Sequence, residues 1–574
     1  MPEYHRLENI EDVDEFYAAI NRHNLTKSLS PERPYTYWTI ELYDMKNGIR
    51  GGGGLGVLAA DTRRVAEELN VPMTLITPFY PSESHQTFED GEMKTIHLEK
   101  KYADFGFNFV DNVFIKCNNQ LTKLDVVEKV IGSTRILSIT EPNFGELYSD
   151  VSWGDHRLYQ EVALGFGGYQ ALKLVGLKPA IMQLNEVATF FAALARLDEL
   201  ASSGMDFYEA VVYTRKHTLY TNHTLVQAAE AQFNYEQFER YVFPNLKSKA
   251  VKKWLQDKFN NGLIKLSSVT IEIAEMRSGV SKLHARVANY KDIAGNKVKF
   301  KAITNGIDLK TWILPKILDF YHESEILNKF DYETKDYIDL LDKIEGKTIR
   351  ELKSAGRKVL NEILTKHPDQ NGKTLFFNDN EIIFDFKRRF VDYKRPWLPF
   401  SDPKRLRMIL EKHNAHYIFT GRVHEGDENM YGHLKELLNI IESDPFLKTH
   451  VHYIPDYDEE IAFALSVGSN ITINTPIVGL EACGTSWEKD IGNLCLLIST
   501  HDGGVADCPS DSYLTITGQT EEEEIESLYI RMEEAAKAWK NDFDLEYWIR
   551  TELTNYLPVI SGSRMIKDYL EYLF

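Results

Sequence analysis

The chain has 574 residues, too many for a single hydrophobic core, and this length predicts two large lobes. Its formal charge of -20 disfavours a nucleic acid partner, because an acidic surface repels polyphosphates. Four cysteines without a CxxC spacing, and no apolar run long enough to span a bilayer, fit a reduced cytoplasmic protein without membrane contact. The first residues lead into an acidic amphipathic pattern, which predicts an N-terminal helix and not a signal peptide.

The first half of the chain alternates strand patterns with helix patterns. Residues 35–42 alternate aromatic and β-branched side chains, as strands do, and the glycine-rich run 51–56 follows. A helical pattern at 57–69 comes next, so the glycines lie between a strand and a helix, where a turn can hold a phosphate. Further strands are predicted at 72–77, 113–117, 135–140, 180–184, 217–221 and 298–304, and helices at 156–174, 188–200 and 207–215.

The second half begins with a strongly charged helical connection, residues 311–372. Residues 373–520 then alternate strands with helices, the pattern of a doubly wound parallel sheet. The helical tail 521–574 is expected to pack back on the first lobe, residues 1–310. The predicted fold is therefore α/β of the GT-B type, with two Rossmann-like, doubly wound lobes facing a central cleft. The second-lobe strands are predicted at 381–386, 416–420, 450–454, 470–474 and 494–499, and its helices at 403–412, 431–442, 458–467 and 485–491.

Residues 481–489 lie between a predicted strand and a predicted helix, at the carboxyl edge of the predicted sheet. Open α/β folds bind their ligands at this edge. Gly484 permits close backbone approach. Thr485 and Glu488 have capping-box spacing, which predicts a helix start with free amides. Lys489 follows in the first turn, and a lysine beside such a helix start suits pyridoxal phosphate, whose aldehyde needs an amine. A capped surface helix with a solvated lysine explains this segment alone equally well.

A basic cluster occupies residues 387–395, where five of nine residues are Lys or Arg in a strongly acidic chain. It begins where a predicted strand ends, so it points to the same cleft edge as the lysine segment. Guanidinium forks and an ammonium group suit a phosphate dianion. The alternative is a solvated basic face or an internal network of salt bridges.

These motifs occur with several others in a fixed order, at residues 39–43, 53–56, 220–224, 277–284, 303–308, 387–395 and 481–489. In this set and order the chain resembles the α-glucan (glycogen, starch and maltodextrin) phosphorylase family, in its compact bacterial and archaeal branch. The resemblance runs in patches from about Tyr35 to Asp507.

The resemblance implies a pyridoxal phosphate cofactor in Schiff-base linkage to Lys489. It implies that inorganic phosphate lies against Arg389 and Lys394, at the glycine turn. The remaining cofactor and phosphate contacts that it implies are Thr485, Ser486, Arg388, Tyr43, Trp312 and Tyr457 for the cofactor, and Gly53, Gly54 and Leu55 for the turn.

The sugar contacts that the resemblance implies are His223 and Asn305 at the 6-hydroxyl, Glu481 and Tyr393 at the ring hydroxyls, and the backbone of Cys483 and Gly484. The implied reaction is retaining phosphorolysis of an α-1,4-glucan, glycogen or maltodextrin, to glucose 1-phosphate. Two phosphates close together repel, so one keeps a proton and acts as general acid. No carboxylate pair and no metal site is expected. The sequence leaves open whether the chain forms a homo-oligomer.

The chain departs from the family pattern at three places. Residues 185–189 lack the usual histidine and have Ala188. Trp487 and Glu488 replace a small residue and a methionine before the lysine, and small residues follow Asp502. These departures leave the chain length and linkage of the acceptor undecided, and whether it is a glucan, while the cofactor and phosphate motifs are intact.

Two other functions fit the sequence. A nucleotide-sugar-dependent GT-B glycosyltransferase, similar to glycogen synthase, would share the glycine turn and the basic site but would not need Lys489. A catalytically silent glucan-binding homologue would retain glucan and release no glucose 1-phosphate.

Overall fold

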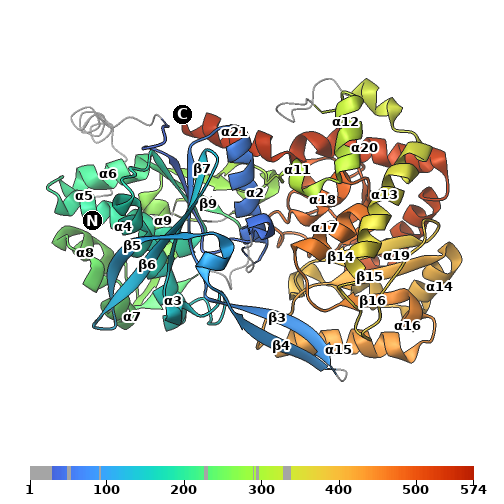
Figure 1. Cartoon of the computed structure of the whole chain (residues 1–574), viewed down its shortest axis with the longest axis horizontal. Coiled ribbons are helices and arrows are strands. Elements are labelled where there is room, and N and C mark those ends of the chain that lie inside the picture. The colour runs from blue at the N-terminus through green and yellow to red at the C-terminus, as the bar shows by residue number, and fades with distance from the viewer. Residues whose placement is uncertain are drawn as a thin grey trace.

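The structure is a computed structural model that describes residues 29–47, 49, 53–89, 92–224, 231–288, 290–291, 296–327 and 338–574. The predicted N-terminal helix, Gly51 and Gly52 lie outside these residues. Two large sheets, each packed between helices, form two lobes side by side (Figure 1). The predicted α/β class is confirmed. In the described part of the chain, no helix combines the length and the apolar character needed to cross a bilayer.

The first lobe is built on a nine-stranded sheet with the order β13-β12-β9-β8-β1-β2-β7-β6-β5. Seven neighbouring strands, β13 to β7 in this order, run parallel, and the last two pairings, β7 with β6 and β6 with β5, are antiparallel. The strand order reverses between β1 and β8, and such a switch point is where open α/β sheets bind ligands. The strands are β1 (Tyr35–Trp38), β2 (Met73–Pro78), β5 (Asn108–Cys117), β6 (Gln120–Ile131), β7 (Thr134–Thr140), β8 (Ile181–Asn185), β9 (Thr218–Asn222), β12 (Met276–Gly279) and β13 (Lys301–Ala302).

Strands β1, β2, β8 and β9 are buried on both faces, as strands inside a parallel sheet are. The helices of this lobe are α2 (Gly54–Glu68), α3 (Asp155–Val162), α4 (Gly168–Leu174), α5 (Phe190–Ser202), α6 (Phe207–Lys216), α7 (Tyr235–Tyr241), α8 (Lys249–Gln256), α9 (Leu266–Ile273) and α10 (Lys282–Val287). A small ribbon pairs β10 (Gln232–Asn234) with β11 (Leu263–Lys265).

The second lobe has a six-stranded parallel sheet in the order β16-β15-β14-β17-β18-β19. Taken in chain order this is 3-2-1-4-5-6, the order of the Rossmann fold, and it reverses between β14 and β17. The strands are β14 (Ile382–Lys387), β15 (Ala415–Thr420), β16 (Val451–Ile454), β17 (Ile471–Asn474), β18 (Leu496–Thr500) and β19 (Leu514–Ile516), and the helices are α14 (Pro403–His413), α15 (Glu428–Ser443), α16 (Leu447–His450), α17 (Glu459–Gly468) and α18 (Ser486–Gly492). The first five strands confirm the sequence prediction, which missed β19.

Helices also connect and cross the two lobes. The connection contains α11 (Leu309–Trp312), α12 (Pro315–Glu323) and α13 (Gly346–Leu364), and the C-terminal part contains α19 (Glu521–Ala538), α20 (Asp542–Ile560) and α21 (Gly562–Leu573). Figure 1 shows this C-terminal part, in red, passing from the second lobe back to the first. There Met565, Ile566 and Tyr569 of α21 share a core with Tyr35 and Leu58 of the first lobe.

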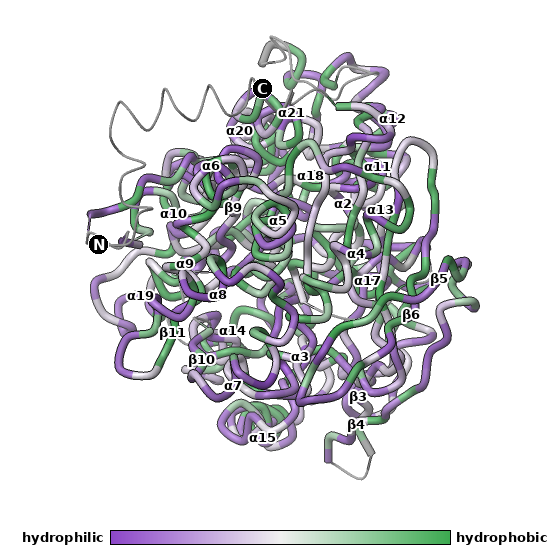
Figure 2. Tube along the Cα trace, turned by 90° about the vertical axis from the view of Figure 1, so that its left-hand side faces the viewer, coloured by the Kyte–Doolittle hydropathy of each residue, from purple (hydrophilic) through white to green (hydrophobic). Residues whose placement is uncertain are grey.

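A hairpin that the sequence analysis did not predict, β3 (Ser82–Glu89) and β4 (Glu92–Glu99), leaves the first lobe and reaches the second. It lies beside α15 in both views (Figures 1 and 2), and Lys435 of α15 forms an ion pair of 2.8 Å with Glu92. Its strands are mostly polar, without an alternating apolar face, so they carry no period-2 signal.

Candidate active site between the two lobes

A cavity, called the main cavity below because the predicted site residues line it, lies between the lobes, where residues that follow the strand-order reversals of both sheets face each other. It has a volume of about 510 Å³, within the range of ligand sites in proteins. It brings together nearly all the residues that the sequence predicted for the site, from Tyr43 in the first lobe to Lys489 in the second. These lining residues are Tyr43, Gly53, Gly54, Leu55, His223, Asn305, Arg388, Arg389, Tyr393, Lys394, Tyr457, Glu481, Cys483, Gly484, Thr485, Ser486 and Lys489.

The amine of Lys489 lies 3.3 Å from the centre of the Trp312 ring, so this predicted residue also contacts the site without lining the cavity. The Trp312 indole N–H donates to both oxygens of Asp61, at 2.9 and 3.0 Å, which fixes the ring. Lys489 is only 4% exposed, and burial lowers its pKa to about 8, although Asp61 opposes the shift. A buried lysine of lowered pKa is a stronger nucleophile near neutral pH, because more of it is uncharged.

Arg388 is buried beside the lysine segment with part of its guanidinium unused. Its Nη1 and Nη2 have no hydrogen-bond partner among the described residues. A Cβ at Gly484 would come within 3.3 Å of Nη1, so glycine keeps this space open. Burial lowers the pKa of Arg388, which nevertheless stays charged. Two orphaned NH2 groups on a buried cation are costly unless an anion fills the site.

Arg389 and Lys394 bring positive charge to the cavity that the start of α2 also lines. The Arg389 side chain is exposed to the cavity, and its guanidinium lies 3.4 Å from the Cβ position of Gly53, the N-cap of α2. Lys394 lies 3.5 Å from Glu481, and burial lowers its pKa to about 8. Glu41 accepts hydrogen bonds from the Gly53 amide and from the Tyr148 hydroxyl, which anchors the glycine turn. In the first turn of α2 the Gly56 amide donates to the Gly53 carbonyl at 3.1 Å, and the amides of Gly54 and Leu55 come before it in the helix.

His223 is held as a neutral ring. Its Nε2 lies 3.0 Å from Asn185 Oδ1, while the Asn185 amide donates to the Trp38 carbonyl, which assigns Oδ1 as the acceptor. Burial lowers the pKa of His223 to about 3. Since Nε2 carries the proton, Nδ1 is an acceptor that can take a hydrogen bond from a hydroxyl.

Asn305 and Glu481 present unused acceptors in the same cavity. Asn305 is 3% exposed and donates to the Cys483 carbonyl at 3.1 Å, while its Oδ1 has no hydrogen-bond partner among the described residues. The Glu481 carboxylate is 8% exposed, and its backbone N–H donates to Asp502. Such acceptors are satisfied by hydroxyl donors, which sugars supply in number.

Tyr43 and Tyr457 are aromatic residues in the lining of the cavity. The Tyr43 hydroxyl accepts from the Glu459 amide at 3.3 Å, a contact between the two lobes. Burial raises the pKa of Tyr457 to about 12. Together with Trp312 they give aromatic walls to the space around Lys489.

Two details differ from the sequence predictions. The capping box is wrong, because Thr485 makes no side-chain capping bond, and the Glu488 carboxyl instead accepts from the Cys483 thiol. The basic cluster also divides. Lys387 pairs with Asp385 and Asp490, and Arg395 bonds Thr475 and Glu524, so these two side chains form internal ion pairs.

Glu186 is a site residue that the sequence analysis noted only as part of a motif. Its backbone has φ 65° and ψ 165°, a region nearly restricted to glycine, and its carboxylate accepts from the His223 amide at 2.5 Å. Burial raises its pKa to about 7. Backbone strain leaves no trace in the sequence, so no sequence signal could have found it.

A family model described as carbohydrate phosphorylase matches residues 178–557. The chain belongs to the carbohydrate phosphorylase family. Among curated relatives of this family, the maltodextrin phosphorylase of Thermococcus litoralis is 25% identical, over 95% of this chain and 70% of the relative. The glycogen phosphorylase of Mycobacterium tuberculosis is 24% identical, over 91% of this chain and 68% of the relative. An uncharacterized protein of Methanocaldococcus jannaschii is 26% identical, over 94% of this chain and 100% of its own length.

Proposed function

We propose that this phosphorylase has the GT-B architecture and splits α-1,4-glucans such as glycogen or maltodextrin with inorganic phosphate, releasing glucose 1-phosphate with retained configuration. The observation that carries the proposal is one cavity that holds a buried amine, Lys489, and two orphaned guanidinium nitrogens of Arg388. The names of the maltodextrin and glycogen phosphorylases support the same reaction class.

The residues around Lys489 fit pyridoxal phosphate. The amine would bond to the cofactor aldehyde, the ring would lie between Trp312, Tyr43 and Tyr457, and Arg388 would pair with the cofactor phosphate. The backbone at Thr485 and Ser486 would add donors to that phosphate. The cofactor supplies a second phosphate dianion beside the reacting phosphate.

Inorganic phosphate would lie between Arg389, Lys394 and the first amides of α2, because these donors line the same cavity and Arg389 lies against Gly53. Beside a second phosphate held by Arg388, this anion would keep a proton more tightly, so it would arrive protonated and could donate that proton to the glycosidic oxygen. The cations then stabilise the phosphate as it bonds to the anomeric carbon. The side chains of Arg389 and Lys394 hold and orient the phosphate, and the proton moves from the phosphate to the glycosidic oxygen.

The glucose ring would be held on its hydroxyls by the acceptors that the protein leaves unused. His223 Nδ1 and Asn305 Oδ1 would take the 6-hydroxyl, and Glu481 and Tyr393 the ring hydroxyls. Backbone groups of Cys483 and Gly484 complete this side of the cavity. Each of these acceptors is buried or half-buried, so a sugar without the matching hydroxyl would leave a buried acceptor without a hydrogen bond, which costs binding free energy.

The test is phosphate-dependent release of glucose 1-phosphate from maltodextrins of graded length by purified protein loaded with pyridoxal phosphate. Borohydride reduction of the loaded protein should place the label on Lys489, as read by peptide mass. Sugar transfer from a nucleotide sugar without any cofactor would replace the proposal with a glycosyltransferase. Glucan binding without glucose 1-phosphate, with or without added cofactor, would make the chain a silent homologue.

A further inference from the structure

A cavity of about 1050 Å³ lies in the second lobe, at the amino edge of its sheet. Its lining includes Ile382, the first residue of β14, and Asn470, which precedes β17. Lys387, the last residue of β14, lines the main cavity instead, so the two cavities lie at opposite ends of this strand. Among the described residues they share no lining residue.

Positive charge dominates this lining, and we call the hollow the basic cavity. Seven Lys or Arg side chains and four Asp or Glu side chains line it, an excess of three positive charges in a chain whose formal charge is -20. Arg350 pairs with Asp542, and Lys347 lies 3.8 Å from Glu351. The other five cations form no ion pair with a described carboxylate. These are Lys316, Lys358 and Lys540, which are exposed, and Lys353 and Arg357, which are buried.

The two buried cations stand one turn apart on α13, and each is 4% exposed. Lys353 donates to the Asn493 carbonyl at 3.1 Å and to the Cys495 sulfur at 3.2 Å. Arg357 donates to three backbone carbonyls and to Asn470 Oδ1. These partners satisfy N–H groups without cancelling the charge, and burial lowers the pKa of both cations. The wall therefore contains two positive charges that a bound anion would stabilise.

The two remaining carboxylates of the lining are engaged with neutral donors. Asp379 accepts from the Ser354 hydroxyl at 2.6 Å, and Glu381 accepts from the amide and the side chain of Asn378. Neither forms an ion pair with a lysine or an arginine among the described residues. They therefore leave the three exposed lysines available to a ligand.

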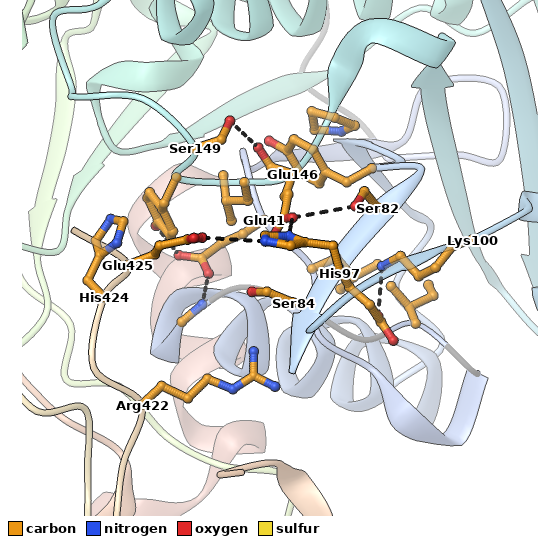
Figure 3. Close-up of a pocket in the computed structure, with 18 of the residues that line it drawn as sticks. Glu41, Ser82, Ser84, His97, Lys100, Glu146, Ser149, Arg422, His424 and Glu425 are labelled. Atoms are coloured by element: carbon orange, nitrogen blue, oxygen red, sulfur yellow. Dashed lines mark hydrogen bonds and ion pairs between the residues drawn. The ribbon is translucent and has the colours of Figure 1, made fainter. Parts of the chain in front are cut away.

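The cavity of about 330 Å³ beside the hairpin β3–β4 shows the opposite arrangement (Figure 3). There Lys100 lies 3.1 Å from Glu83, and His97 lies between Glu146 and Glu425. An anion would have to compete with these carboxylates. The basic cavity has no such competition for its five unpaired cations, so it is the better place for an anion.

We propose that the basic cavity binds the polyphosphate group of a small ligand through Lys316, Lys358 and Lys540, in front of the buried charges of Lys353 and Arg357. One phosphate group carries about two negative charges, so two or three linked phosphates match this set of cations. The volume lies at the upper end of the range for ligand sites, roughly 1,000 Å³, which is more than a single phosphate needs.

The lining also has an apolar part, Ile382 and Trp539, that could contact an attached organic group. The phosphates can therefore belong to an inorganic polyphosphate or to a nucleoside triphosphate. The site is independent of the proposed reaction, since the main cavity lies at the other end of β14.

The test is calorimetric titration of the purified protein, loaded with pyridoxal phosphate, with tripolyphosphate, adenosine triphosphate or inorganic phosphate at physiological salt. The variant Lys358→Glu/Lys540→Glu reverses two exposed charges of the basic cavity. Its matched control is Lys249→Glu/Lys404→Glu, which makes the same change of total charge at two exposed lysines that line neither the basic nor the main cavity. We expect the first double variant to bind tripolyphosphate about a hundredfold more weakly than wild type, because each charge-assisted contact is worth about tenfold or more. The control should bind as wild type does, since distant charges are screened.

Arg389→Ala separates this site from the phosphate contacts of the main cavity, and it should bind tripolyphosphate as wild type does. Affinity lost in Arg389→Ala but kept in Lys358→Glu/Lys540→Glu would overturn the proposal. An equal loss in both double variants would also overturn it, as would inorganic phosphate binding as tightly as tripolyphosphate, or no binding of either polyphosphate. With the expected pattern in the variants, tighter binding of adenosine triphosphate than of tripolyphosphate would assign the site to a nucleoside triphosphate, and equal or weaker binding would assign it to the polyphosphate group alone.

Discussion

Replacing Arg388 with methionine tests whether the buried guanidinium is kept for an anion. In the cofactor-free protein, Arg388 is 4% exposed and its Nη1 and Nη2 have no hydrogen-bond partner among the described residues. An unsatisfied buried polar group costs about 1–3 kcal/mol, so removing it while keeping the volume should stabilise the cofactor-free protein by about 2 kcal/mol. For a lobe of this size that is a rise of roughly 4–8 °C in the melting temperature.

The same substitution should remove the rise in melting temperature that pyridoxal phosphate gives to wild type, because the cofactor phosphate loses its buried cation. Arg395→Met is the matched control. Arg395 is equally buried, but it bonds the Thr475 carbonyl at 3.0 Å and pairs with Glu524. Its loss should destabilise the protein by about 3–5 kcal/mol with or without cofactor.

The assay is thermal unfolding of the three proteins, each prepared without cofactor and after reconstitution. Opposite signs for the two arginine variants in the cofactor-free state would support the reasoning. If Arg388→Met is as destabilised as Arg395→Met, or keeps the full response to cofactor, the anion assignment of Arg388 is refuted.

Four further predictions follow from the site and the hairpin. Lys489→Ala should abolish phosphorolysis and the borohydride-trapped label; normal activity would refute the cofactor assignment. Arg389→Ala should raise the KM for phosphate by about tenfold or more and leave glucan binding unchanged, since a charge-assisted contact is worth about 1.5–3 kcal/mol, as initial rates at varied phosphate will show. Burial lowers the pKa of Lys394 to about 8, so its charge is lost as pH rises through 8 and kcat/KM for phosphate should fall there; a Lys394→Arg variant without that fall is the control. Hydrogen bonds to Asp456 and Glu83 raise the pKa of His85 to about 9, so its contribution to stability is complete below its ordinary value of about 6.5 and disappears as pH rises through 9. The melting temperature of wild type should therefore fall more than that of His85→Gln between those pH values, and parallel curves would contradict it.

The second lobe was predictable because its local patterns agree with its fold. Strands β14 to β18 are short apolar runs separated by amphipathic helices, and their carboxyl ends carry Arg388 and Glu481 at the switch point. The hairpin β3–β4 gave no such signal, because tertiary contacts such as Gln86 with Val423 hold its polar strands in place. Residues this far apart in sequence carry no local mark of their contact.

At the candidate site, the sequence identified which side chains come together but not how they are held. Residue type and strand-end position led to Lys489 and the basic cluster, and the family resemblance added His223 and the role of Arg389. Lys489, Arg389 and His223 all line one cavity. The sequence did not reveal that the basic cluster divides. Lys387 and Arg388 are adjacent, yet Lys387 pairs with Asp385 and Asp490, while Nη1 and Nη2 of Arg388 have no hydrogen-bond partner among the described residues. Only the direction of each side chain from its strand decides between these outcomes.

The unusual residues before Lys489 lie on the protein side of the helix. Trp487 is 1% exposed and packs edge-on against Tyr556 of α20, at 5.2 Å between ring centres, so it belongs to the second-lobe core. Glu488 is fully buried, and burial raises the pKa of its carboxyl far above the ordinary value. Neither residue lines the main cavity, whereas Thr485, Ser486 and Lys489 do, as the helical repeat of 3.6 residues requires. The substitutions therefore alter the support behind the lysine and leave the face towards a cofactor unchanged.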